Sequence, residues 1–137
     1  MLIKLKNKDT LLVGDFIFKC CVGKKGLNKN KIEGDNSTPR GLFSLGKLYY
    51  RPDRVNKPET KLKIRRINRN MGWSIDSKSW TYNSEIKINN KIKHEKLFRK
   101  DYKYNYFIVI NYNIKNKVSN KGSAIFIHLT KNYSPTI

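Results

Sequence analysis

The chain has 137 residues, of which 38% are hydrophobic, and its 30 Lys or Arg against 10 Asp or Glu give a formal net charge of +20. This length supports one domain with a real core and excludes two, so residues 1–137 are predicted to form a single domain. No apolar stretch approaches the ~20 residues of a membrane-spanning helix. No signal peptide is visible either, because Gly14 interrupts the first apolar run and no small-residue cleavage site follows it.

The excess of positive charge has two interpretations. A net charge of +20 predicts attraction to an anionic partner such as nucleic acid, a membrane surface or an acidic wall polymer. However, Lys, Asn and Ile are abundant throughout the chain, and the lysines are spread along it instead of forming one block. The charge therefore predicts non-specific attraction to polyanions and no specific nucleic-acid site.

The first half of the chain consists of apolar runs separated by polar turns, a pattern typical of β-strands. Residues 2–6 and 11–22 are predicted to form two strands joined by the polar turn at residues 7–10. A loop rich in Gly, Asn and Lys follows at residues 23–38. Residues 41–50 are predicted to form the next strand.

The second half adds one helix candidate to this pattern. Residues 51–70 are basic and contain two prolines, which predicts a loop with a short extended piece. Residues 94–101 are the best helix candidate, because Glu95 and Arg99 are spaced for an i,i+4 ion pair. The nearly continuous apolar run at residues 106–112 predicts a strand buried on both faces. The fold class predicted from these elements is mainly β, a β-rich α+β fold with one short helix.

Cys20 and Cys21 are the only cysteines. Neighbours in a strand point to opposite faces and a disulfide between them is strained, so no structural bridge is expected. Two cysteines without spaced partners make no zinc site. They lie in the apolar run 16–22, which is not the start of a helix that could lower a thiol pKa, so both are expected to be buried and inert.

The last sixteen residues, 122–137, contain the most informative stretch. A short apolar run at residues 124–127 is bounded by glycine and proline, and it predicts a buried strand that ends at His128. Alternation places Ala124, Phe126 and His128 on one face of this strand. A histidine held at a strand end can act as a general base. It can equally be a polar strand-end residue capped by a backbone carbonyl.

Short motifs follow one another along nearly the whole chain. They are Cys20-Cys21-Val22-Gly23, Lys31-x-Glu33-Gly34-Asp35, Thr38-Pro39-x-Gly41-x-Phe43, Tyr50-Arg51-x-Asp53-Arg54, Gly72-Trp73, Tyr82-Asn83, Glu95-x-Leu97-x-Arg99-x-Asp101, Tyr112-Asn113 and Gly122-Ser123-Ala124-Ile125-Phe126-Ile127-His128. Together they resemble the YkuD-type L,D-transpeptidase catalytic domain, in the branch without extra binding modules. The resemblance implies a β-sandwich of mixed sheets with one short helix.

The resemblance also implies a cysteine acyl-transfer enzyme that acts on peptidoglycan stem peptides. A thiolate attacks the carbonyl of the third residue of a tetrapeptide stem and releases the terminal D-alanine, and the acyl group then passes to an amine or to water. This chemistry requires an imidazole close to the thiol. By the resemblance, His128 is that base. No metal or organic cofactor is implied.

The chain departs from the family pattern at its last residue. After Pro135-Thr136 the family continues with x-Gly-Cys, whereas this sequence stops at Ile137, the x position. We therefore expect the nucleophilic cysteine and the closing segment of the sheet to be missing, which leaves an apolar edge and no transpeptidase activity. Cys20 and Cys21 match a separate family cysteine that is structural. A gene model cut short and an inactive relative are both consistent with this departure.

Four residues are candidates for substrate binding by the resemblance: Tyr82, Asn83, Arg99 and Thr136. The Arg99 charge suits a stem carboxylate, although an ion pair with Glu95 or Asp101 is an equally good interpretation. The expected partners are peptidoglycan stem peptides. The family implies a cell-envelope location, which conflicts with the lack of a visible export signal.

A second hypothesis is a non-catalytic basic module that binds an anionic polymer, either wall glycan or nucleic acid. The basic residues 61–69 favour it, as do the tyrosines at positions 102, 104 and 106, which are spaced to stack on rings. The same tyrosines run directly into the apolar run at residues 106–112. They are therefore equally consistent with a place in the core.

Overall fold

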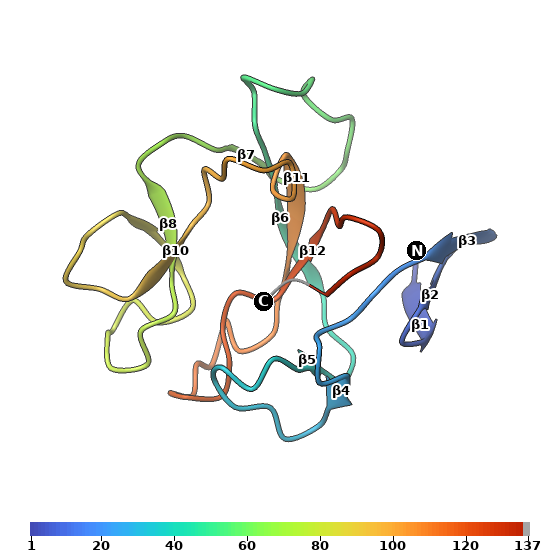
Figure 1. Ribbon diagram of the computed structural model, residues 1–137, viewed down its shortest axis with the longest axis horizontal. Coiled ribbons are helices and arrows are strands. Elements are labelled where there is room, and N and C mark those ends of the chain that lie inside the picture. Colours follow the sequence, from blue (N-terminus) through green and yellow to red (C-terminus); the bar gives the residue numbers. More distant parts are fainter. Residues whose placement is uncertain (136–137) are drawn as a thin grey trace. The chain divides into compact units, whose positions relative to one another are not determined.

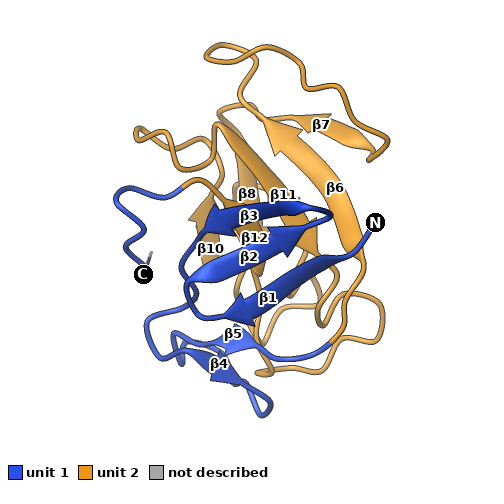
Figure 2. Cartoon of the chain, turned by 90° about the vertical axis from the view of Figure 1, so that its right-hand side faces the viewer, with its two compact units in different colours: residues 1–41, 130–137 blue, residues 42–129 orange. Residues whose placement is uncertain are grey.

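The computed structural model describes residues 1–135, which form twelve β-strands and no helix (Figure 1). The mainly β prediction is therefore confirmed. None of these residues belongs to a helix with the length and apolar character needed to cross a bilayer. The chain divides into two compact units, which are coloured separately in Figure 2. Unit 1 comprises residues 1–41 and the segment from Thr130 onwards, and unit 2 comprises Leu42–Leu129.

Unit 1 contains a small antiparallel sheet in the order β1-β2-β3, formed by β1 (Ile3–Asn7), β2 (Thr10–Val13) and β3 (Phe16–Lys19). Its second element is a short parallel pair, β4 (Leu27–Asn28) with β5 (Thr38–Pro39). The single strand predicted for residues 11–22 is wrong, because the chain turns back at Gly14, where φ is +56°. Only glycine and a few polar residues adopt that conformation readily, so the apolar run becomes a hairpin.

Unit 2 contains two sheets. The four-stranded sheet has the order β12-β11-β6-β7 and is formed by β6 (Leu45–Tyr50), β7 (Ile64–Arg66), β11 (Tyr106–Ile110) and β12 (Phe126–His128). It is mixed, because β7 runs parallel to β6 whereas the other pairs are antiparallel. The three-stranded sheet has the order β10-β8-β9 and is formed by β8 (Met71–Ser74), β9 (Glu85–Lys87) and β10 (His94–Lys96).

Aromatic side chains from both sheets form the core of unit 2. Tyr49 of β6 stacks on Phe107 of β11 with ring centroids 4.6 Å apart. Phe126 of β12 lies 4.5 Å from Phe107 and meets Trp73 of β8 edge-on at 5.1 Å. Such pairs contribute about 0.5–1.5 kcal/mol each beyond the burial of their area. The strand that carries His128 is therefore anchored by Phe126 to the centre of the core.

The helix predicted for residues 94–101 is wrong. Residues His94–Lys96 form β10, in which Glu95 lies opposite Trp73 of β8. The expected i,i+4 pair does not form, since the Glu95 carboxylate accepts a hydrogen bond from Tyr104 and Arg99 binds Asp101. One i,i+4 ion pair stabilises a helix by only about 0.2–0.5 kcal/mol, which cannot outweigh pairing with an existing sheet.

Candidate functional site

His128 is the last residue of β12 and lies opposite Phe107 of β11. Its ring packs edge-to-face against the ring of Tyr104, with centroids 5.4 Å apart and an interplanar angle of 77°. Phe126 contacts the same tyrosine, at 5.9 Å. The two β12 side chains therefore share a face of the strand, as the alternation predicted. The His128 side chain is half-buried, so packing fixes the ring without sealing it from solvent.

One backbone contact sets the tautomer of His128. The Nδ1 atom lies 2.7 Å from the carbonyl oxygen of Leu129. A carbonyl oxygen only accepts hydrogen bonds, so Nδ1 must carry the proton and donate it. In the neutral ring Nε2 then has a free lone pair and is the nitrogen that can accept a proton. The carbonyl cap and the general base, two interpretations of the sequence, are thus compatible in one geometry.

The surroundings of His128 favour its neutral form. Burial lowers the pKa of the imidazole below its ordinary value, and the Leu129 carbonyl opposes that change. The positive charges of Lys103 and Arg99 lower the pKa further, whereas Asp101 raises it. Burial is the largest of these effects, and it disfavours the imidazolium ion. At neutral pH the ring is accordingly a base with an unprotonated Nε2.

Tyr104 connects His128 to the carboxyl group of Glu95, which is half-buried. The phenol is only 4% exposed, and its hydroxyl donates a hydrogen bond to Oε1 of Glu95. Burial raises the pKa of Glu95, an effect opposed by the Tyr104 hydrogen bond and by the charge of Arg99. The pKa of Tyr104 is itself raised far above its ordinary value by burial and by Glu95. The phenol therefore stays protonated and keeps its ring against the imidazole.

Arg99 and Asp101 form a closed ion pair close to this cluster. The Arg99 Nε and Nη2 atoms donate to the two carboxylate oxygens at 2.9 and 2.6 Å. This bidentate contact is the main reason that the pKa of Asp101 falls to about 2. The guanidinium also lies over the Tyr104 ring, 5.1 Å from its centroid. The sequence suggested a stem carboxylate, Glu95 or Asp101 as the partner of Arg99, and in the structure the ion pair is with Asp101.

Asn83 is 1% exposed and binds backbone and side-chain groups through both ends of its amide. Its Oδ1 accepts from Trp73 Nε1 at 2.9 Å and from the Ala124 N–H at 3.0 Å. Its Nδ2 donates to the carbonyls of Tyr112 and Asn113, at 3.0 and 2.8 Å. Two acceptor and two donor contacts satisfy the whole group, so this side chain acts as an anchor within unit 2.

The segment that leads into β12 has an unusual backbone. Ala124 has φ +54° and Gly122 has φ +111°, and the first of these values is rare for a residue with a Cβ atom. Tyr82 and Asn83 hold both residues, because the Gly122 N–H donates to the Tyr82 hydroxyl at 2.9 Å and the Ala124 N–H donates to Asn83. These contacts fix the direction in which the strand carrying His128 begins.

The remaining residues of interest belong to unit 1. Cys20 and Cys21 are unpaired and half-buried, and the Cys21 Sγ lies 3.7 Å from the Thr130 hydroxyl. Burial, followed by Cys21 and Asp9, raises the pKa of the Cys20 thiol, which is the opposite of thiolate activation. The fourth candidate for substrate binding, Thr136, lies outside the described residues.

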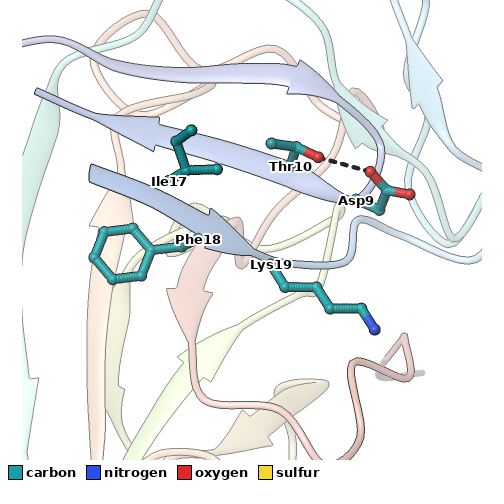
Figure 3. A pocket seen from close by; sticks show the side chains of 5 residues that line it. All are labelled: Asp9, Thr10, Ile17, Phe18 and Lys19. Carbon is teal, nitrogen blue, oxygen red and sulfur yellow. Dashed lines mark hydrogen bonds between the residues drawn. The ribbon is translucent and has the colours of Figure 1, made fainter. Parts of the chain in front are cut away.

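Two surface depressions are shallow and neither is lined by His128. One lies in unit 1 and is lined by Asp9, Thr10, Ile17, Phe18 and Lys19, of which Thr10 donates to Asp9 at 2.8 Å (Figure 3). The other lies in unit 2 and is lined by Pro52, Asp53, Arg54, Val55, Asn56 and Tyr106. Within residues 1–135, no group of three His, Cys, Asp or Glu side chains is arranged to hold a metal ion.

Sequence reasoning identified His128 but missed two residues that the structure brings to it. Tyr104 touches the imidazole ring. The Lys103 carbonyl accepts a hydrogen bond from the Leu129 N–H at 3.2 Å. Tyr104 and His128 lie 24 positions apart in the sequence, and the pairing of β11 with β12 brings them together. The register of that pairing follows from the buried faces of both strands, which no local motif encodes.

Three comparisons with known proteins give one match. The family model described as the L,D-transpeptidase catalytic domain, YkuD, matches residues 3–136, which is nearly the full chain. The match includes His128 and the residues described around it: Glu95, Arg99, Asp101, Lys103 and Tyr104. The comparison with curated proteins found no match, and neither did the comparison with solved structures.

Proposed function

The chain belongs to the YkuD family of L,D-transpeptidase catalytic domains, and from this premise we propose that it serves cysteine-dependent acyl transfer on peptidoglycan stem peptides with His128 as the general base. Peptidoglycan is the substrate that the family implies. The family match spans both units, which supports a single catalytic-type domain over residues 1–137.

The observation that carries the role of His128 is its tautomer. Because Nδ1 donates to Leu129, Nε2 is left to take the proton of a thiol. The resulting thiolate attacks the carbonyl carbon of the third stem residue, and the oxyanion collapses to a thioester as the bond to the terminal D-alanine breaks. His128 returns its proton to the leaving amine. An acceptor amine, or water, then attacks the thioester, loses its proton to Nε2 and regenerates the thiol.

The thiol of this scheme is not supplied by residues 1–137. The family pattern has its nucleophilic cysteine two residues beyond the position of Ile137, and Cys20 and Cys21 are the only cysteines in the sequence. The raised pKa of the Cys20 thiol argues against its activation. We therefore propose that these 137 residues supply the base and its surroundings, and that on their own they do not turn over substrate.

A thiol-reactive carbapenem tests this proposal, because acylation adds a mass that intact-protein mass spectrometry detects. We expect no acylation of the 137-residue chain and one adduct on a chain extended by Gly-Cys and the closing segment of a family member. In the extended chain, His128→Gln should slow acylation by about 10²–10⁴-fold, the usual contribution of a general base.

Two controls separate the outcomes of this experiment. Cys20→Ser with Cys21→Ser in the extended chain should leave the adduct in place. Stoichiometric acylation of the 137-residue chain itself would contradict the proposal, and so would an extended chain that reacts equally well without His128.

The alternative is a basic module that binds an anionic polymer, and it requires the tyrosines at positions 102, 104 and 106 to be free to stack on the rings of that polymer. Tyr104 is buried and its hydroxyl is bound to Glu95. Tyr106 is half-buried and donates to the Asn56 carbonyl at 2.9 Å. Of the three tyrosines that could stack on rings, Tyr102 alone is classed as exposed, at 42%. A row of stacking rings is therefore not what these residues form.

A further inference from the structure

The charged groups near His128 are not all paired. Arg99 and Asp101 neutralise each other through two hydrogen bonds. The Glu95 carboxylate accepts a hydrogen bond from the Tyr104 hydroxyl. Lys103 is the remaining charged group that acts on His128, and no described residue forms an ion pair or a hydrogen bond with its Nζ atom. One positive charge is thus left over beside the imidazole.

The backbone holds Lys103 firmly next to His128. Its N–H donates to Asp101 Oδ1 at 3.1 Å, and its carbonyl accepts from the N–H of Leu129 at 3.2 Å. The next residue, Tyr104, carries the ring that packs against the imidazole. Lys103 is half-buried, and its ammonium group forms no ion pair or hydrogen bond with a described residue. An ammonium group without an ion-pair partner can form a charge-assisted hydrogen bond with an anion that binds next to it.

We infer that Lys103 binds the free terminal carboxylate of the peptide that is presented to His128. This inference rests on the proposed function and deepens it, since it assigns the group that recognises the leaving residue. In a stem that ends in D-alanine, only the N–Cα–C backbone of that residue separates the scissile carbonyl carbon from the terminal carboxylate, a span of about 3–4 Å. A lysine side chain rooted beside the general base can cover such a span, because its four-carbon stem is flexible.

Arg99 is less suited to this task, although its charge suggested it. Its guanidinium group already donates hydrogen bonds to both carboxylate oxygens of Asp101. To bind a substrate carboxylate it would have to break a bidentate pair, which is among the strongest side-chain contacts in proteins. Lys103 has no such pair to break among the described residues. The choice between the two cations is therefore decided by their existing partners.

The test compares two synthetic tetrapeptide stems that end in D-alanine, one with a free carboxylate and one with a carboxamide. Their binding to the 137-residue chain is followed by NMR of the His128 and Lys103 side chains. A charge-assisted hydrogen bond predicts that the acid binds about tenfold more tightly than the amide. The acid, and not the amide, should shift the Lys103 Hε resonances of the unsubstituted chain.

Three variants identify the cation responsible. Lys103→Gln should bind both peptides equally, whereas Lys103→Arg should keep a preference for the acid. Lys100→Gln is the matched control, because Lys100 is an exposed lysine three residues earlier and its loss changes the net charge equally. Lys100→Gln should preserve the full discrimination.

Several results would overturn the inference. One is that the unsubstituted chain binds neither peptide, or binds both equally well. Another is that Lys103→Gln still prefers the acid as strongly as the Lys100→Gln control does. The carbapenem experiment is independent of these measurements. Acylation of the extended chain without acid–amide discrimination would remove the role of Lys103 and leave the proposed function standing. Discrimination without acylation would do the reverse.

Discussion

At the level of single residues, the protonation state of His128 depends on burial, one hydrogen bond and three neighbouring charges. The Leu129 carbonyl determines which nitrogen of His128 carries the proton. Burial, Lys103 and Arg99 lower the pKa of the ring, so the neutral form is populated at physiological pH. A lower pKa also makes the ring a weaker base, and general bases work best when the pKa lies near the working pH. The Leu129 carbonyl and the charge of Asp101 act in the opposite direction and raise the pKa of the ring.

The lowered pKa of His128 predicts a specific pH dependence of stability. An unfolded histidine has a pKa of about 6.5 and binds a proton below it more readily than the folded residue does. The unfolded state therefore binds more protons between the folded pKa and about 6.5, and the free energy of unfolding decreases as the pH falls through this window. Urea unfolding at about pH 7.5 and about pH 5.5 measures the change.

His128→Gln isolates this contribution from that of the carboxyl groups. The free energy of unfolding of the original chain minus that of His128→Gln should decrease as the pH falls. The reason is that burial opposes protonation of the His128 imidazole, which the variant lacks. His94→Gln controls for loss of the other imidazole. A difference that stays constant between the two pH values would contradict the assigned effect of burial on His128.

At the level of secondary-structure elements, β12 is held in place by side chains that lie far away in the sequence. Its partner in the sheet is β11, and in the described part of the chain it is an edge strand. Asn83 and Tyr82, which lie between β8 and β9, bind the N–H groups of Ala124 and Gly122 just before the strand begins. The orientation of His128 is therefore coupled to the loop that follows β8.

This coupling predicts a large effect of substitution at Asn83. Asn83→Ala leaves the Trp73 and Ala124 N–H donors and two backbone carbonyls without their partner. Buried polar groups that lose a partner cost about 1–3 kcal/mol each before relaxation, so we expect a loss of about 3 kcal/mol in the free energy of unfolding. The exposed Asn90→Ala should change it by less than about 0.5 kcal/mol. Equal effects of the two substitutions in urea unfolding would show that Asn83 is no anchor.

Much of the strand content could be predicted from the sequence, because the strands carry their pattern locally. The run predicted at residues 2–6 overlaps β1 and the run at 106–112 contains β11, since alternating or continuous apolar residues favour a strand in any sheet. The helix at 94–101 was wrong because its evidence was a single charge pair, and both charges found other partners. His128 was found through its motif. Lys103 and Tyr104 were not, because strand register and not spacing brings them to the ring.

At the level of the whole molecule, the dominant property is unbalanced charge. The excess of 30 basic over 10 acidic residues exceeds what internal ion pairs can neutralise. Several acids are already engaged: Asp35 with Lys31, Asp53 with Arg51, Glu85 with Arg65, and Asp101 with Arg99. The cations that remain repel one another more strongly in the folded chain than in the expanded one. Charge therefore opposes folding.

Screening should then stabilise the chain. Raising the ionic strength from about 0.01 M to about 0.15 M shortens the Debye length from about 30 Å to about 8 Å, which weakens long-range repulsion more than the short ion pairs. We expect the Tm of nucleic-acid-free protein to rise over this range. Sodium chloride and choline chloride at equal ionic strength should raise it equally, because screening does not depend on the identity of the cation. A Tm that stays constant or falls would mean that the ion pairs, for instance the bidentate contact of Arg99 with Asp101, outweigh the repulsion among the remaining cations.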